Sequence, residues 1–163
     1  MTLEADNSKD ATWWADAAFA VHPDMKSHAG GLLSYGKGAM QTMSRKQKLN
    51  AKSSTQAKVF GADDVSSNLL WIKCSMEAQG CKQNPTLMQD NASAILLEKN
   101  GCESAGKQSR HIDIRHFHIE DCYERQELDV KCCPTEKMTA DHFTKPLQGK
   151  KFHEFGKMIV NLG

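Results

Sequence analysis

Three aspartates lie in or next to segments that are expected to form strands and a helix, and their carboxylates could carry chemistry. Asp16 lies inside the apolar segment TWWADAAF, Asp90 follows the short apolar segment PTLMQ, and Asp141 lies near the C-terminus in a segment with helical character. A carboxylate inside an apolar strand is costly unless it is paired or binds a metal. Carboxylate oxygens suit Mg2+, and two such ions can activate a water and stabilise a leaving oxygen in phosphodiester cleavage. On spacing alone, solvated or helix-capping acids remain the simpler explanation.

Basic residues gather between positions 37 and 58, where there are six lysines or arginines and no acid. A solvated basic face is the ordinary explanation of such a cluster, and a strip that contacts phosphates is the functional one. The net charge of +1 does not by itself indicate a nucleic-acid-binding protein. The candidate phosphate contacts are Arg45, Lys46, Lys48 and Lys52.

The composition is that of an ordinary globular domain, with 163 residues, of which 39% are hydrophobic and 25% charged. The longest apolar runs are too short to cross a bilayer, so no membrane insertion is expected. Six cysteines occur without a secretory signal or a C-x-x-C pair, which favours reduced, mostly buried thiols in an intracellular, reducing compartment. The three tryptophans are expected to pack rather than to stack on bases. We expect a flexible N-terminal lead over residues 1–11 and one domain over residues 12–163.

The N-terminal half predicts a meander followed by a long helix. Residues 12–19, 30–35 and 39–44 are expected to form strands joined by turns. Residues 53–79 repeat apolar side chains at three- and four-residue steps, which is typical of a helix with one buried stripe. The stripe consists of Ala57, Phe60, Gly61, Val65, Leu69, Ile72 and Met76.

The C-terminal half predicts two more strands and several helices. The strands are expected at 85–89 and 128–133. The helices are expected at 90–99, 110–126, 136–143 and 152–162. Together with the first half, this order predicts an α/β fold, with a five-stranded mixed sheet and flanking helices.

Seven short segments, in order along the chain, carry a resemblance to a known family. They are WADAAFA (14–20), KSHAGG (26–31), SRKQK (44–48), SSTQAK (53–58), QDNASA (89–94), RHIDIR (110–115) and TADHFTKPL (139–147). Each resembles a motif of the ribonuclease H domain of copia-type LTR retrotransposon Pol polyproteins. No single segment is specific, but together they extend from residue 14 to residue 147.

The resemblance implies a ribonuclease H-like fold and cleavage of the RNA strand of an RNA–DNA hybrid during reverse transcription. It places Asp16, Asp90 and Asp141 at three of the family's catalytic metal-ligand positions. It also implies Mg2+ as the cofactor and the RNA–DNA hybrid as the partner.

The sequence departs from the family pattern at the strand-one motif and at the helix start. Ala18 stands where the family has a second acid, while Gln56 and Lys58 stand where it has two glutamates. The second of these glutamates is a metal ligand in the family, and an ammonium repels Mg2+ instead of binding it. We therefore expect the Lys58 ammonium to point into the carboxylate cluster and hybrid cleavage to be slow or absent.

Two hypotheses follow. The chain is a magnesium-dependent ribonuclease impaired by Lys58, or it is a catalytically inactive, retroelement-derived domain that acts as a structural or binding subunit of a protein assembly. The three aspartates and the basic strip favour the first hypothesis, and Gln56 with Lys58 favours the second.

Overall fold

The computed structural model describes residues 3–5, 10–100 and 113–162. A five-stranded sheet in the order β5-β3-β2-β6-β7 forms its centre. The strands are β2 (Thr12–Ala18), β3 (His28–Ser34), β5 (Gln41–Lys46), β6 (Thr86–Gln89) and β7 (Asp129–Cys132). β2, β3 and β5 pair antiparallel, whereas β6 is parallel to β2 and β7 is parallel to β6. The predicted five-stranded mixed sheet is confirmed.

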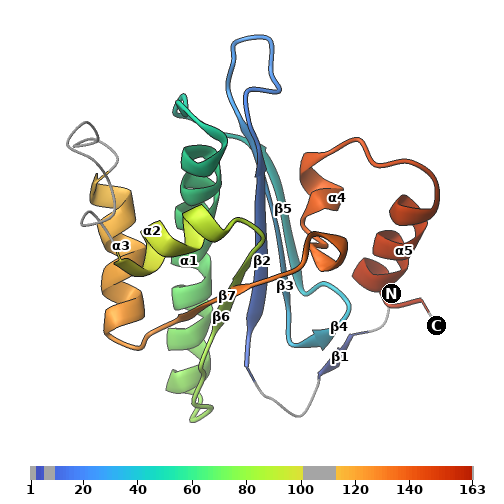
Figure 1. Ribbon diagram of the computed structural model, residues 1–163. Helices are drawn as coiled ribbons and strands as arrows, with labels where there is room; N and C mark the ends of the chain where they lie inside the picture. Colours follow the sequence, from blue (N-terminus) through green and yellow to red (C-terminus); the bar gives the residue numbers. More distant parts are fainter. Residues whose placement is uncertain (1–2, 6–9, 101–112, 163) are drawn as a thin grey trace.

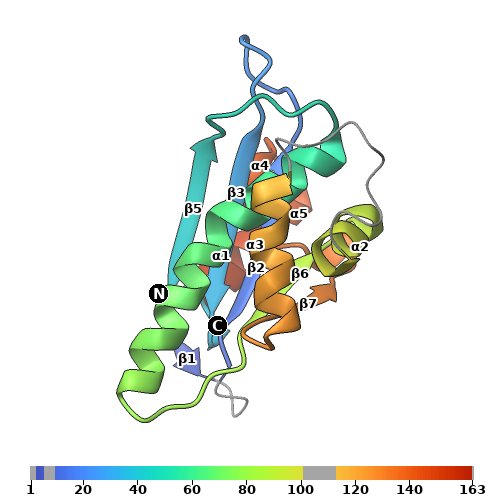
Figure 2. The ribbon, with the colours of Figure 1, turned by 90° about the vertical axis from the view of Figure 1, so that its left-hand side faces the viewer.

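Helices cover both faces of this sheet, as Figure 1 shows. One side carries α1 (Ser54–Ala78), α2 (Ala92–Asn100) and α3 (Asp113–Glu124), and the other carries α4 (Asp141–Thr144) and α5 (Gly149–Val160). Figure 2 looks onto the first side, where α1 and α3 lie in front of the sheet. No helix in the described part of the chain is long and apolar enough to cross a membrane.

The main core lies between α1 and the sheet. Trp13 and Ala15 on β2 meet Val65, Leu69 and further side chains of α1 in one buried cluster. Six members of the predicted stripe are buried, from Ala57 to Ile72, and Met76 is partly buried against the same cluster. The period of apolar residues along α1 therefore identified the face that packs on the sheet.

The start of α1 explains one departure from the family pattern. The Ser53 side chain accepts a hydrogen bond from the Gln56 backbone N–H at 3.1 Å. The Gln56 side-chain oxygen accepts one in return from the Lys52 backbone N–H at 2.6 Å. This reciprocal arrangement is close to a capping box, in which glutamine serves as well as glutamate. Gln56 therefore has a structural role at the first turn of the helix.

The predicted helix over residues 136–143 is wrong. The structure has a short 3₁₀-helix, η2 (Thr135–Lys137), and then the separate α4, with a non-helical Met138 between them. Met138 is fully buried with Cys133 and Ala140, against Trp14 and Met88. Packing of this side chain onto the sheet outweighs the local helix preference. As a result, Asp141 is the first residue of α4 and not an interior helical position.

Two expectations about the burial of side chains, for the cysteines and for Trp71, are also wrong. Cys74, Cys81 and Cys132 are exposed and only Cys122 and Cys133 are buried among the described cysteines, so the expectation of mostly buried thiols is wrong. Trp71 is 70% exposed and does not pack as expected.

The division at residue 11 stays a prediction. Within the expected lead, β1 (Glu4–Ala5) pairs with β4 (Gly36–Lys37), and residues 1–2 and 6–9 lie outside the described part. The beginning of the expected helix over 110–126, and with it the first three residues of the RHIDIR motif (110–112), also lie outside it.

Candidate carboxylate centre

Asp16, Asp90 and Asp141 converge at one place on the sheet. Each offers a carboxylate oxygen, and these oxygens all lie within 4.8 Å of one another. Asp16 and Asp141 are each about 1% exposed, and Asp90 is half-buried. The residues lie 74 and 51 positions apart in the sequence, so their meeting is a result of the tertiary fold.

Two neighbouring strands bring the first two carboxylates together. β6 is parallel to β2, with Trp14 opposite Met88 in the register. Asp16 follows Trp14 by two residues, and Asp90 follows Met88 by two residues. Because side chains alternate between the two faces of a strand, both aspartates lie at equivalent positions toward the same end of the parallel pair.

A close approach of α4 to β3 adds the third carboxylate. A Cβ atom at Gly30 would lie 2.5 Å from Thr144 Cγ2, 2.9 Å from Phe143 Cβ and 3.1 Å from the Ala140 carbonyl oxygen. Only glycine leaves enough room there for α4 to pack directly on the strand. Asp141 and Thr144 thereby reach the centre, and the Thr144 hydroxyl donates to Asp16 Oδ2 at 2.6 Å.

Lys58 on α1 lies between two of the carboxylates. Its ammonium donates to Asp16 Oδ1 at 2.8 Å and also to Asp90 Oδ1. The side chain is largely buried, with 13% of it exposed. The expectation that the Lys58 ammonium points into the cluster is confirmed.

Two further lysines pair with the second oxygen of Asp16 and with both oxygens of Asp141. Lys145 lies 2.5 Å from Asp141 Oδ1 and 3.3 Å from Asp16 Oδ2, and Lys151 lies 3.1 Å from Asp141 Oδ2. The centre thus holds three carboxylates and three ammonium groups, whose formal charges sum to zero. Sequence analysis missed Thr144, Lys145 and Lys151. The four-residue spacing of Asp141 and Lys145 within a helical segment was a usable signal for one of these contacts.

The ion pairs outweigh the effect of burial on the ionisation of these groups. Burial would raise the pKa of Asp16, but the Lys58 charge, hydrogen bonds from Lys58 and Thr144, and the Lys145 charge lower it to about 2. Burial would lower the pKa of Lys58, yet Asp16 and Asp90 raise it above its ordinary value. Burial likewise opposes the charged form of Lys145, whereas Asp141 and Asp16 raise its pKa. The charged forms are therefore the stable ones.

The three aspartates alone form a suitable ligand set for a divalent cation, because all are hard oxygen donors close together. The complete set of side chains does not fit a two-magnesium centre. Position 58 supplies a cation where the resemblance expects a fourth carboxylate, and both oxygens of Asp16 and of Asp141 face lysine ammonium groups. The roles of the aspartates as ligands and as catalytic groups stay predictions.

The four predicted phosphate contacts lie along β5 and the segment that leads into α1. Arg45 pairs with Asp64 at 3.2 Å, and Lys46 pairs with Asp24 at 2.7 Å. Lys48 and Lys52 are exposed and make no ion pair with another described residue. The ammonium groups of Lys48 and Lys52 are therefore more available to an external phosphate than those of the other two residues. The role of this basic strip in nucleic-acid binding stays a prediction.

The chain is similar in sequence to retrotransposon Pol polyproteins. The chain is 31% identical over 151 residues to a retrovirus-related Pol polyprotein from transposon TNT 1-94 of Nicotiana tabacum, a match that covers 91% of the chain. It is 28% identical over 160 residues to the Pol polyprotein from transposon RE2 of Arabidopsis thaliana, covering 97% of the chain. The matches cover 11% and 10% of these relatives, so the chain spans about a tenth of their length. No protein-family model matches the chain.

Solved structures identify the fold. LC11-RNase H1, isolated from compost by a metagenomic approach, matches with a TM-score of 0.61 at 12% identity, covering 83% of this chain and 92% of the other. LC11-RNase H1 in complex with an RNA/DNA hybrid matches with a TM-score of 0.57 at 13% identity, covering 82% and 93%. The chain is a ribonuclease H-like domain related to copia-type Pol polyproteins.

The predicted fold class is thus confirmed, since the ribonuclease H-like domain has the expected mixed sheet and the expected relatives. At these low identities, the solved structures establish the fold alone. In this ribonuclease H-like domain the cation at position 58 joins two of the three aspartates.

Proposed function

We propose that this ribonuclease H-like domain binds RNA–DNA hybrids and that Lys58 keeps it from cutting the RNA strand efficiently. The observation that carries this proposal is the position of the Lys58 ammonium, which bridges Asp16 and Asp90 from a fixed point on α1. The proposal has two parts. The first is recognition of the RNA–DNA hybrid, as in relatives with this fold, and the second is a carboxylate centre whose formal charges are already balanced.

Electrostatics support impaired cleavage. A divalent cation attracted by three carboxylates would also meet the Lys58 ammonium, which those carboxylates already hold. Two like unit charges at about 4 Å repel each other by about 4 kcal/mol at an effective dielectric near 20. Lys58 lies in the second turn of a long helix, and its withdrawal would remove the ion pair at Asp16 Oδ1 and leave Lys145 as the remaining cation beside that carboxylate. Hydrolysis through bound magnesium is therefore disfavoured in this chain.

Two observations support hybrid binding. The matched structure of LC11-RNase H1 is a complex with an RNA/DNA hybrid. In this chain, Lys48 and Lys52 present exposed ammonium groups on the segment that enters α1, the helix that also carries Lys58. Phosphate backbones bind such unpaired cations with a strong dependence on salt.

The test measures binding and cleavage separately on one labelled RNA–DNA hybrid. The natural chain should bind the hybrid more tightly than duplex DNA, with affinity that falls as salt rises, and should cut it slowly or not at all in Mg2+. Lys58→Glu should raise the cleavage rate at least about 100-fold, since the variant restores the fourth acid and removes the cation. Lys82→Glu makes the same charge change at an exposed loop position and should not alter cleavage.

Binding has its own matched variants. The double variant Lys48→Glu and Lys52→Glu should weaken hybrid binding at least about 10-fold at moderate salt, whereas Lys82→Glu should not. If the natural chain cuts the hybrid as fast as Lys58→Glu, the role given to Lys58 is wrong. A chain that binds no hybrid contradicts the recognition half of the proposal and leaves the structural role in an assembly as the better hypothesis.

A further inference from the structure

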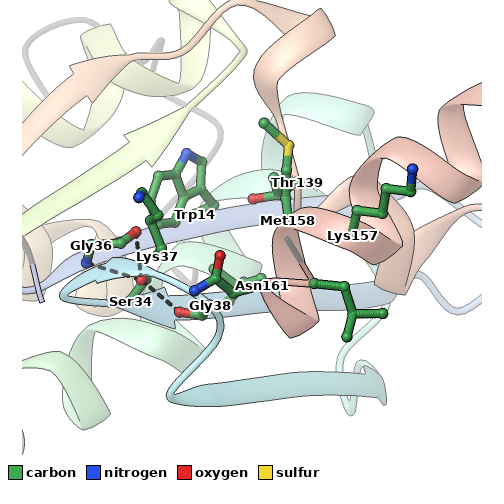
Figure 3. A pocket seen from close by; sticks show the side chains of 11 residues that line it. Trp14, Ser34, Gly36, Lys37, Gly38, Thr139, Lys157, Met158 and Asn161 are labelled. Atoms are coloured by element: carbon green, nitrogen blue, oxygen red, sulfur yellow. Dashed lines mark hydrogen bonds between the residues drawn. The ribbon is translucent and has the colours of Figure 1, made fainter. Parts of the chain in front are cut away.

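A cavity of about 410 Å³ lies between the C-terminal helix and the sheet, beside the β4 turn. Figure 3 shows Trp14 and the turn at Gly36–Gly38 on one side of it, and Lys157 and Met158 from α5 on the other. Leu32 and Leu162 complete its apolar walls. The volume is within the range of small-molecule sites, which is about 300–1,000 Å³.

One buried polar group in this cavity has no partner. Thr139 is 8% exposed, and its hydroxyl makes no hydrogen bond to any described residue. A buried hydroxyl without a partner costs free energy, so natural structures rarely keep one without reason. Ser34 lines the same cavity and behaves differently, because its hydroxyl bonds the Gly36 and Gly38 carbonyl oxygens at 3.0 and 2.7 Å. The wall of the cavity therefore contains one buried hydroxyl without a hydrogen-bond partner among the described residues, that of Thr139.

The charged side chains that line the cavity are all basic. Its lining contains Lys37 and Lys157 and no acidic residue. Lys37 is engaged with Glu4 at 3.0 Å. Within the described part of the chain no carboxylate pairs with the Lys157 ammonium, and this exposed side chain lines the cavity. Lys157 can therefore pair with an anionic group that enters from outside.

We propose that this cavity binds a small aromatic molecule that carries an anionic group. The ring lies against Trp14 and the apolar wall of Leu32 and Met158, where aromatic contact and burial stabilise it. A polar atom of the molecule bonds the Thr139 hydroxyl, and its anionic group pairs with Lys157. This site is separate from the carboxylate centre and does not depend on hybrid binding.

The proposed site lies next to the chain segments that carry two aspartates of the carboxylate centre. Trp14 precedes Asp16 by two residues on β2, and Thr139 precedes Asp141 by two residues in the segment that enters α4. The Thr139 carbonyl oxygen accepts a hydrogen bond from the His142 backbone N–H at 3.2 Å. A bound molecule therefore touches both chain segments that hold the buried aspartates.

The probe for this site is anilinonaphthalene sulfonate, whose fused rings and sulfonate match the proposed class. Fluorescence titration of the folded chain should give saturable binding of one probe per chain. Lys157→Glu should weaken the affinity about 10-fold, because it replaces attraction to the sulfonate with repulsion. Thr139→Val keeps the shape but removes the hydroxyl and should weaken it about 5-fold, the usual effect of one neutral hydrogen bond.

Matched controls make the result specific. Lys82→Glu repeats the charge change in an exposed loop, and Thr42→Val repeats the hydroxyl removal on the exposed strand β5; both should bind the probe within about twofold of the natural chain. Near-ultraviolet circular dichroism confirms that each variant is folded, and a rise in melting temperature with the probe confirms binding to the native state. The proposal is wrong if probe binding does not saturate, or if all four variants bind the probe with the same affinity.

Discussion

Asp16 and Gly30 are direct partners across β2 and β3, and the missing side chain of Gly30 lets Thr144 reach the Asp16 carboxylate. The most buried acid of the centre is therefore supported by a residue that contributes no atom beyond its backbone. Tight backbone approach, rather than a polar contact, brings α4 to the site. This relationship makes the centre sensitive to a change of one methyl group.

Gly30→Ala should destabilise the domain by about 1–3 kcal/mol, because its Cβ would overlap Thr144 Cγ2 and Phe143 Cβ. The carboxylate centre should loosen at the same time, since α4 must move away from β3. Urea unfolding measures the stability. Gly156→Ala is the matched control, because a Cβ there meets nothing within 4 Å and alanine favours the helix α5. Equal stability of Gly30→Ala and the natural chain would show that α4 does not pack this closely.

Lys58→Glu should make the thermal stability of the domain depend on magnesium. The natural centre carries balanced charges, so chelation of metal with EDTA should leave its melting temperature unchanged. The variant places a fourth acid beside Asp16 and Asp90 and should melt at lower temperature in metal-free buffer, with recovery when Mg2+ is added. Thermal melts of both proteins, with Lys82→Glu as the charge-matched control, measure this. A natural chain strongly stabilised by Mg2+ would contradict the expected charge balance.

Acid should weaken the fold through Asp16. Its pKa is lowered from 3.8 to about 2, so the ionised form is favoured in the folded state. The resulting stability is fully present above about pH 4 and is lost as the pH falls through 2. The shift corresponds to about 2 kcal/mol. Denaturant unfolding between pH 6 and pH 2 should show this loss in the natural chain but not in Asp16→Asn.

The control for the acid experiment is Asp121→Asn. Asp121 pairs with Arg125 at 3.0 Å on the exposed surface of α3, where such pairs contribute little to stability. This variant should therefore keep the acid dependence of the natural chain. Loss of the dependence in Asp121→Asn would place its origin away from the carboxylate centre.

Glu98→Gln should stabilise the domain in alkaline solution. Glu98 is fully buried on α2, and burial raises its pKa from 4.5 to about 8 against the opposing effects of Gln89 and Lys99. A raised acid pKa means that stability falls as the pH rises from about 4.5 through 8, where the buried group must ionise. The neutral amide of the variant would accept the same hydrogen bond from Gln89 without that cost. Urea unfolding should show the variant more stable at pH 9 and nearly unchanged at pH 5; equal curves at pH 9 would contradict the expectation.

Sequence reasoning performed best where local pattern and tertiary packing agree. The stripe from Ala57 to Ile72 faces the sheet because its period matches the helix that packs there. The three aspartates were found through short motifs, and Lys58 was recognised as a cation among acids. Those features depend on residue type and order, which a sequence contains directly.

The features that sequence analysis missed depend on tertiary contacts, which no local sequence pattern specifies. Met138 breaks the expected helix because its side chain is buried beneath the sheet with Cys133 and Ala140. Lys151 reaches Asp141 from a helix that begins after the family-like motifs end. Trp71 is exposed although it is large and apolar, because it lies on the solvent side of α1.

In the genetic code, every lysine codon becomes a glutamate codon when its first base changes from A to G. Helix α1 already directs position 58 at Asp16 and Asp90, so such a change would need no new backbone path. Under the proposed function, a single point mutation in the codon of Lys58 would therefore place a fourth carboxylate beside Asp16 and Asp90.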